Sequence, residues 1–334
     1  MGVAIRWFAF VSDSQKFFWN EKVHVRRNRA TNLPGLFLRF LSLGFLLLWD
    51  CSAQAQQEVA VDASHPNIAT KPVRGDDPGI QDNSFLVEEA YNQEFGVVQH
   101  IQAFQRLWNS KDWAYSFTQE WPVDPRPRHQ LSYTLIFLHS GQYSESGSGV
   151  GDVALNYRYQ LVGNGDSKLA FAPRISALLP TGSARLGRGP GGAGIQTMMP
   201  VSLFLNKKLV THWNLGATYV PTARNAAGDR AATVGYNFGQ SFVWLAHHRF
   251  NALLETVVSR NQTVTAPGKT EWGTTLLLNP GIRWAYNFKN GLQIVPGVSV
   301  PVGVGPSSGE RGIFLYFSLE HPYRNVSKHN PRKN

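Results

Sequence analysis

From residue 97 onwards, apolar and polar residues alternate one by one along much of the chain. A period of two places the two sets on opposite faces of a β-strand, whereas helical spacing would scatter both sets around an axis. The alternation recurs over 233–246 and 276–287. It is clearest in residues 152–161, where the apolar set is Val153, Leu155, Tyr157, Tyr159 and Leu161 and the polar set is Asp152, Asn156, Arg158 and Gln160.

The connections between the predicted strands alternate in length. Short turns such as 163–166 and 289–291 alternate with long connections over 180–194, 220–231, 261–271 and 301–310. Bacterial outer-membrane barrels have short periplasmic turns, longer outer loops and an even number of strands. The fold class predicted is therefore all-β, an antiparallel transmembrane β-barrel of about twelve strands. The predicted strands are 97–107, 113–121, 129–139, 150–161, 168–179, 195–205, 209–219, 232–246, 250–260, 272–287, 292–300 and 311–321.

Composition supports a surface that faces lipid. Only 16 % of the 334 residues are charged and 12 % are aromatic, whereas soluble domains carry about 25 % charged residues. The formal net charge of +10 lies mostly at the ends, because residues 1–55 contribute +4 and the four basic residues after Glu320 contribute another +4. A nucleic-acid-binding protein would show a basic stripe along one face instead. We therefore expect no nucleic-acid partner.

Residues 1–55 have the order of a secretory signal segment. Arg26, Arg27, Arg29 and Arg39 precede an apolar run at 40–49, and Ala53-Gln54-Ala55 supplies a small-residue cleavage site before Gln56. Translation from a start near Val23 would give a signal of ordinary length. A lipoprotein signal at Cys51 is disfavoured, because Leu48-Trp49-Asp50 lacks small residues. Cleavage removes the only cysteine, which excludes disulfides, cysteine zinc sites and thiol catalysis from the mature chain.

The mature chain divides into three predicted parts: a periplasmic N-terminal segment over 56–96, the barrel over 97–321 and a basic C-terminal tail over 322–334. Residues 56–83 are polar and rich in turn residues, which predicts irregular structure. Residues 84–95 are open to two alternatives, a short helix capped by Ser84 or a small plug. We favour a simple lead-in to the first strand.

Four short motifs carry a family resemblance: Gly149-Val150-Gly151-Asp152-Val153-Ala154-Leu155, Leu179-Pro180-Thr181-Gly182, Pro200-Val201-Ser202 and His212-Trp213-Asn214-Leu215-Gly216. Over roughly 110–321 the chain resembles the outer-membrane barrel family labelled "putative MetA-pathway of phenol degradation", whose members are often called transporters. The resemblance implies a porin-like protein of the bacterial outer membrane that passes small solutes, among them hydrophobic or aromatic compounds. Its expected partners are outer-membrane lipid, the small-molecule solute and the barrel-assembly machinery. The chain departs from such proteins by ending in Asn334 rather than an aromatic residue, so Phe317 or Tyr323 would serve as an internal assembly signal.

No motif indicates catalysis. Gly189-Pro190-Gly191-Gly192-Ala193-Gly194 fits G-x-G-x-x-G, but no helical pattern follows it, so we expect an outer loop rather than a nucleotide site. His247-His248 has no carboxylate or cysteine near it in sequence and predicts a surface turn rather than a metal site. No G-x-S-x-G motif is present. We expect no catalytic residue, cofactor or metal, and therefore no enzyme.

The alternation also predicts which side chains face the lumen. A charge facing lipid at the midplane costs about 2–4 kcal/mol, so charged residues belong inside. These residues either brace a filled lumen or line a solute path, and their mixed signs predict no strong ion selectivity. The leading hypothesis is an outer-membrane channel or transporter, and the alternatives are a structural or adhesive barrel with a closed lumen and an outer-membrane hydrolase. The predicted lumen residues are Glu120, Asn156, Arg158, Arg174, Gln196, His212, Asn214, Asn237, Glu255, Asn279, Arg283 and Glu320.

Overall fold

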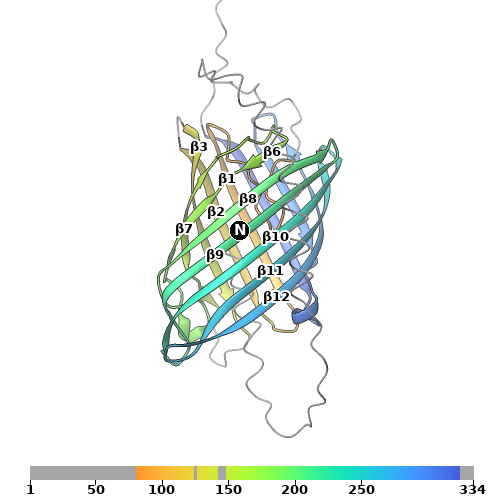
Figure 1. Ribbon diagram of the computed structural model, residues 1–334. Helices are drawn as coiled ribbons and strands as arrows, with labels where there is room; N and C mark the ends of the chain where they lie inside the picture. The colour runs from red at the N-terminus through yellow and green to blue at the C-terminus, as the bar shows by residue number, and fades with distance from the viewer. Residues whose placement is uncertain (1–79, 124–125, 142–147, 324–334) are drawn as a thin grey trace, which may run out of the picture. The chain divides into compact units, whose positions relative to one another are not determined.

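The computed structural model describes residues 80–123, 126–141 and 148–323. The predicted signal segment, most of the predicted 56–96 segment and nearly all of the C-terminal tail lie outside this part of the chain. The described residues form one closed barrel of twelve antiparallel strands, four of which are interrupted by a short break (Figure 1). No helix within these residues is long and apolar enough to cross a membrane.

The strands follow one another in space as they do in sequence. The uninterrupted strands are β1 (Val97–Leu107), β2 (Trp113–Val123), β3 (Arg126–His139), β8 (Gly194–Asn206), β9 (Leu209–Arg224), β10 (Arg230–His247), β11 (Phe250–Ala266) and β16 (Gly312–Pro322). The interrupted strands are β4 (Gly149–Val150) with β5 (Val153–Tyr159), β6 (Leu169–Phe171) with β7 (Arg174–Leu179), β12 (Lys269–Trp284) with β13 (Tyr286–Asn287), and β14 (Gln293–Ser299) with β15 (Val302–Gly303). The predicted strands and fold class are confirmed.

Antiparallel pairing of the first and last strands closes the barrel. β1 pairs with β16 from Val97↔Pro322 to Leu107↔Gly312, and β1 also pairs with β2 on its other side. β12 pairs with β14, which in turn pairs with β16. Closure leaves no sheet edge with unpaired backbone groups, as a barrel in lipid requires.

Two of the four predicted long loops are wrong. Over 220–231 and 261–271 the strands continue, so that β9 ends at Arg224, β10 begins at Arg230, and β11 and β12 meet at a tight turn after Ala266. The strict alternation ends there, because Val220 and Ala223 are both buried with two exposed residues between them, but the strands stay paired through register shifts. The other two connections remain loops, each with one 3-10 turn, η2 (Ala184–Leu186) or η3 (Gly305–Ser307).

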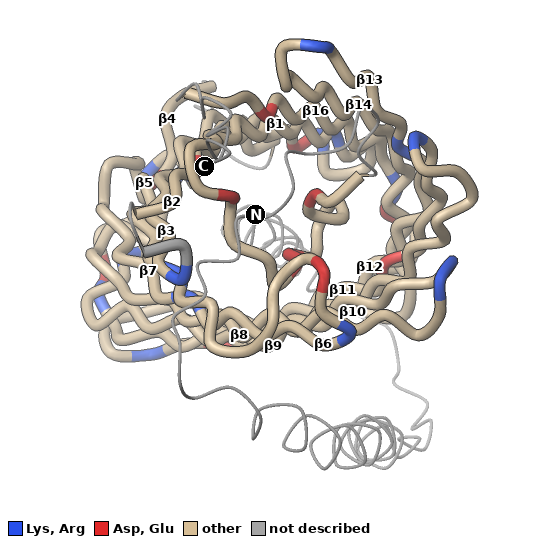
Figure 2. The backbone as a smooth tube through the Cα atoms, turned by 90° about the horizontal axis from the view of Figure 1, so that it is seen from above, with Lys and Arg blue, Asp and Glu red and all other residues tan. Residues whose placement is uncertain are grey.

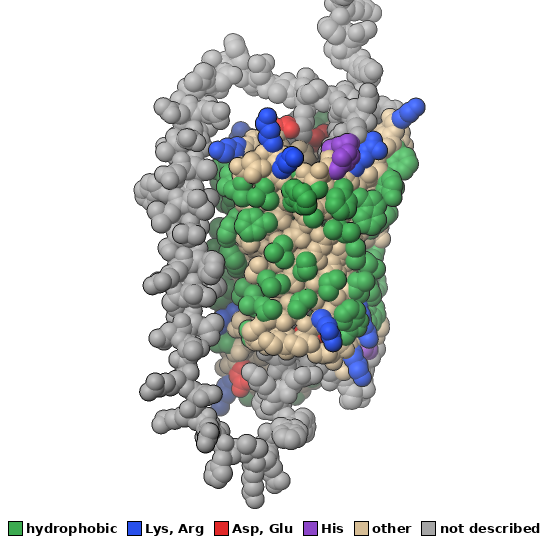
Figure 3. Space-filling model, turned by 90° about the vertical axis from the view of Figure 1, so that its right-hand side faces the viewer, with side chains coloured by type: hydrophobic (Ala, Val, Ile, Leu, Met, Phe, Trp, Pro, Cys, Tyr) green, Lys and Arg blue, Asp and Glu red, His purple; other side chains and the backbone are tan. Residues whose placement is uncertain are grey.

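The outer face of the barrel is apolar. Large hydrophobic side chains such as Leu155, Ile195, Leu215 and Leu254 are exposed on it, and Leu215 reaches 54 % relative exposure. Figure 3 shows hydrophobic side chains over the barrel wall and basic side chains gathered towards its two ends. This distribution matches an apolar band facing lipid between two polar interfaces.

A stretch of irregular chain lies inside the ring of strands. Residues 82–90 are all buried, although they form neither helix nor strand. Figure 2 looks down the barrel and shows chain within the ring. We call residues 80–95 the inner segment. The short helix considered for 84–95 does not form, and the favoured interpretation as a simple lead-in is also wrong for these residues, because the lumen side chains bind their backbone groups.

Candidate functional site

The inner segment depends on side chains for its backbone hydrogen bonds. Buried N–H groups outside helices and strands must find other partners, because each one left unpaired costs free energy. Of the nine residues 85–93, eight donate their backbone N–H to a side-chain oxygen, and seven of these eight hydrogen bonds go to residues of the barrel. The wall of the lumen therefore fixes the path of the segment.

Glu255 on β11 binds three successive N–H groups of the inner segment. Its Oε1 accepts from Phe85, Leu86 and Val87 at N···O distances of 2.8, 2.9 and 3.0 Å. Its Oε2 accepts from Asn279 on β12 at 2.7 Å, which orients the carboxylate. Glu255 has no exposed surface, so these donors replace the water it has lost.

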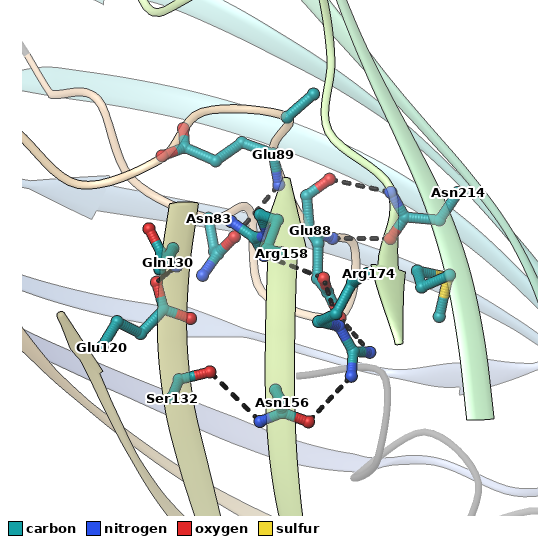
Figure 4. A network of polar contacts seen from close by, with 12 residues as sticks. Asn83, Glu88, Glu89, Glu120, Gln130, Ser132, Asn156, Arg158, Arg174 and Asn214 are labelled. Carbon is teal, nitrogen blue, oxygen red and sulfur yellow. Dashed lines mark hydrogen bonds and ion pairs between the residues drawn. The ribbon is translucent and has the colours of Figure 1, made fainter. Parts of the chain in front are cut away.

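Glu88 of the inner segment forms buried ion pairs with two arginines of the opposite wall (Figure 4). Its Oε2 lies 2.9 Å from Arg158 Nη2, on β5. The guanidinium of Arg174, on β7, donates to both carboxylate oxygens, from Nη2 to Oε1 at 2.7 Å and from Nε to Oε2 at 3.1 Å. Such a bidentate ion pair fixes the orientation of the carboxylate and also neutralises its charge.

Amide and hydroxyl side chains hold the rest of the segment's backbone. Asn214 accepts from the N–H of Glu88 at 2.7 Å and donates to its carbonyl at 2.8 Å. Ser202 Oγ accepts from the N–H of Ala90 at 2.8 Å. Gln160 and Gln130 accept from the N–H groups of Asn92 and Gln93.

Phe85 fits a cradle formed by two glycines. A Cβ added at Gly281 on β12 would lie 2.4 Å from the Phe85 ring, and one added at Gly297 on β14 would lie 2.5 Å from it. Below 3.0 Å something must shift, so both positions exclude any larger residue while the ring is in place. The ring also packs against Phe314 and Tyr316 of β16, at centroid distances of 5.7 and 5.5 Å.

The N-terminal end of the inner segment is fixed at the same side of the barrel. Arg283 Nη1, on β12, donates to the carbonyl oxygens of Asp82 and Asn83, and the first of these contacts is 2.7 Å long. The Asp82 carboxylate accepts from Gln99 on β1 and from the Tyr316 hydroxyl. Contacts on β1, β12 and β16 thus hold the segment where the barrel closes.

All twelve predicted lumen residues lie at inward positions, and eleven are fully buried while Asn237 is half-buried. Six of them contact the inner segment directly. Arg158, Arg174, Asn214, Glu255 and Arg283 do so through hydrogen bonds, and His212 packs edge-on against Tyr91 at a centroid distance of 6.1 Å. Four more contact those residues or another residue that holds the segment, namely Glu120, Asn156, Gln196 and Asn279. Asn237 instead contacts Met198, and Glu320 pairs in register with Gln99 and Gln293.

Sequence reasoning missed several residues that hold the segment. Gln130, Gln160 and Ser202 are buried at inward positions and each accepts a backbone N–H from it. Their side chains follow the same alternation as their neighbours, which could have identified them. The alternation could not predict that these side chains bind backbone N–H groups of the inner segment.

The motifs considered for catalysis or metal binding lie before a strand, at an exposed turn and against the inner segment. A strand, β8, follows the glycine-rich 189–194 stretch, so the helix that a nucleotide site needs does not follow it. His247 and His248 lie exposed at the turn between β10 and β11. Ser202 Oγ and His212 Nδ1 lie 2.7 Å apart, but this hydroxyl is the one that accepts the Ala90 N–H.

Neither a protein-family model nor a curated protein matches the chain. Several solved structures of porins and channels do match it. A NanC porin is 9 % identical, with 66 % of this chain and 98 % of that chain covered and a TM-score of 0.44. A KdgM porin is 10 % identical, with coverages of 68 and 99 % and a TM-score of 0.39. The CymD monoaromatic hydrocarbon channel is 11 % identical, with coverages of 70 and 90 % and a TM-score of 0.37. The chain is thus similar in barrel fold to proteins of this kind.

Proposed function

We propose that this protein is a channel for small solutes in the bacterial outer membrane, closed in the present state by its own inner segment. The apolar outer face supports residence in lipid, and a closed barrel leaves no backbone group unpaired there. Solute would pass along the polar wall once the inner segment moves. Outer-membrane lipid and the barrel-assembly machinery are the partners this location implies.

One observation carries the proposal. The charged residues of the lumen bind a separate stretch of chain rather than only one another, with Glu255 on the segment's N–H groups and two arginines on its Glu88. A barrel with a permanently closed lumen needs only side chains that bind one another across the lumen. A segment without helix or strand is instead held by contacts that can be exchanged for water.

The resemblance to the phenol-degradation family extends the proposal to hydrophobic or aromatic solutes. The inner wall carries an apolar patch that supports it, formed by Phe314, Tyr316 and Val295, all of which are buried. In the present state Phe85 packs on this patch. An aromatic solute would take the place of that ring.

A structural barrel with a closed lumen is the second candidate. The glycine cradle around Phe85 favours it, because so close a fit stabilises the segment inside the barrel. The two candidates differ in whether the inner segment ever leaves its site.

A reversible tether distinguishes the two candidates. Ser84 Oγ and Ser241 Oγ lie 2.8 Å apart, so cysteines at both positions suit a disulfide between the inner segment and β10. In planar bilayers we expect single-channel openings from the reduced Ser84→Cys/Ser241→Cys protein and none after oxidation. The single variant Ser84→Cys is the control, and its single-channel openings should not change on oxidation. Absence of openings in the reduced protein, or openings that oxidation leaves unchanged, would contradict the proposal.

A further inference from the structure

We infer that Arg158 and Arg174 form a binding site for the carboxylate of a solute, and that Glu88 occupies this site in the closed state. The inference rests on the proposed function and deepens it by naming the solute class. The lumen would take small organic acids, and such an acid would compete with the inner segment for the same two guanidinium groups.

The two arginines face one another as direct neighbours across adjacent strands. Arg158 on β5 pairs in register with Arg174 on β7, and their side chains are 3 and 4 % exposed. Like charges directly opposite each other on a sheet are destabilising, and burial removes the water that would screen them. An anion must therefore lie between them, and in this state it is Glu88.

The wall orients Arg174 without help from the inner segment. Arg174 Nη1 donates to Asn156 Oδ1 at 3.0 Å and also to Ser176 Oγ. Asn156 is held in turn by Ser132 on β3 at 3.2 Å. These partners all belong to strands of the barrel, so the guanidinium keeps its direction when the segment leaves. A site whose supporting contacts exist beforehand binds its ligand more tightly.

The acidic residues of the wall have other contacts. Glu120 on β2 accepts from Gln130 Nε2 at 2.8 Å, and Glu255 is held by Asn279 on the far side of the lumen. Neither carboxylate is an ion-pair partner of Arg158 or Arg174, within the part of the chain that the structure describes. Glu120 still attracts the charge of Arg158 from the wall, so loss of Glu88 leaves chiefly the guanidinium of Arg174 open to a carboxylate from solution.

Asn214 indicates what else the solute carries. It binds both the N–H and the carbonyl of Glu88, while the arginines bind that residue's side chain. Glu88 therefore presents a carboxylate together with an amide a few bonds away. N-acetylglutamate has the same two groups and is a suitable probe, and N-acetylglutamine amide has the same skeleton with both carboxylates replaced by uncharged amides.

Displacement of the inner segment can be measured by thiol labelling, independently of any conductance measurement. Val87 is fully buried, so a cysteine at this position reacts with a water-soluble thiol reagent only when the segment moves. The variant is Val87→Cys with Cys51→Ser, which removes the one native cysteine. We expect N-acetylglutamate to accelerate labelling and the uncharged N-acetylglutamine amide to have no effect.

Variants of the arginines show where the acid binds. Loss of a charge-assisted hydrogen bond typically weakens binding about tenfold or more, so Arg174→Gln should raise the half-maximal N-acetylglutamate concentration by at least that factor. Arg260→Gln is the control, because Arg260 is an exposed arginine of β11 that packs on the Trp272 ring. It should keep the response. If Arg174→Gln does not assemble, Arg174→Lys retains the charge but loses the two-pronged contact and should also weaken the response.

Equal acceleration by both compounds, or an unchanged response in the Arg174 variants, would overturn the inference. Its failure can be told apart from failure of the channel itself. If the reduced tether variant conducts but N-acetylglutamate does not accelerate labelling, the channel stands and the acid site falls. If labelling responds to the acid but no variant conducts, the site stands and the channel falls.

Discussion

Removal of the Glu255 carboxylate should release the inner segment. Glu255→Ala takes away the acceptor of three backbone N–H groups, those of Phe85, Leu86 and Val87. A buried donor that loses its partner costs about 1–3 kcal/mol, so three of them raise the free energy of the closed state by about 3 kcal/mol or more. Since every 1.4 kcal/mol is a factor of ten, the open population should rise by about 100-fold or more.

Hydrogen–deuterium exchange of these amides measures the effect directly. In the native protein the amides of 85–87 should exchange slowly, because exchange requires the segment to leave Glu255. In Glu255→Ala they should exchange about 100-fold faster, while strand amides of β10 and β11 keep their protection. Glu255→Gln retains one oxygen that can accept the three N–H groups and should lie between the two. Unchanged exchange at 85–87 in Glu255→Ala would refute the assignment of Glu255 as the principal anchor.

Three further predictions concern the barrel and its maturation. Leu215 lies on the outer face near the middle of β9, and Leu215→Arg should destabilise the barrel by about 2–4 kcal/mol in urea titrations. Tyr157 lies two residues from the end of β5, and Tyr157→Arg should cost only about 0–1 kcal/mol, because the cost of a lipid-facing charge falls towards the interface. Cysteines placed at Leu215 and Asn214 should both resist a water-soluble thiol reagent, the first because it faces lipid and the second because it lies beneath the inner segment. Glu255→Ala should expose only the second, and labelling at the first would reverse our assignment of the faces. Mass spectrometry of membrane-extracted protein should find an N-terminus near Gln56, and retention of residues 40–49 would contradict a cleaved signal.

The strands and their faces were predictable because a barrel in lipid imposes a period of two along each strand. Strand β1, for example, begins and ends at the predicted residues 97 and 107. Extension of β9 to Arg224 was not predictable from the alternation, because Val220 and Ala223 are both buried with two exposed residues between them, which breaks the period of two. There the backbone pairing continues without an apolar pattern to mark it.

The inner segment illustrates a different limit. Ser84 suits the N-cap of a helix and Glu88 and Glu89 suit its start, so local propensity left a short helix open beside the favoured lead-in. In the folded protein the N–H groups that such a helix would use are taken by side chains 126–170 residues away in sequence, on β9 and β11. The alternation placed the twelve predicted lumen residues at positions that are buried or half-buried, but it held no periodic signal that could pair them with residues 80–95.

Recognition of the inner segment through its backbone has a consequence for how the sequence can change over evolution. The barrel contacts most of residues 85–93 at N–H groups that every amino acid except proline possesses. Substitutions at positions such as Leu86 or Ala90 would leave these contacts in place, whereas Phe85 and Glu88 are also held by their side chains. An insertion or deletion of one residue would move each later N–H by about 3.3 Å along an extended chain and break several contacts together. Among related proteins, the length of this segment should therefore stay constant, while the residues of the segment change within the limits set by the packing of buried side chains such as Leu86 and Ala90.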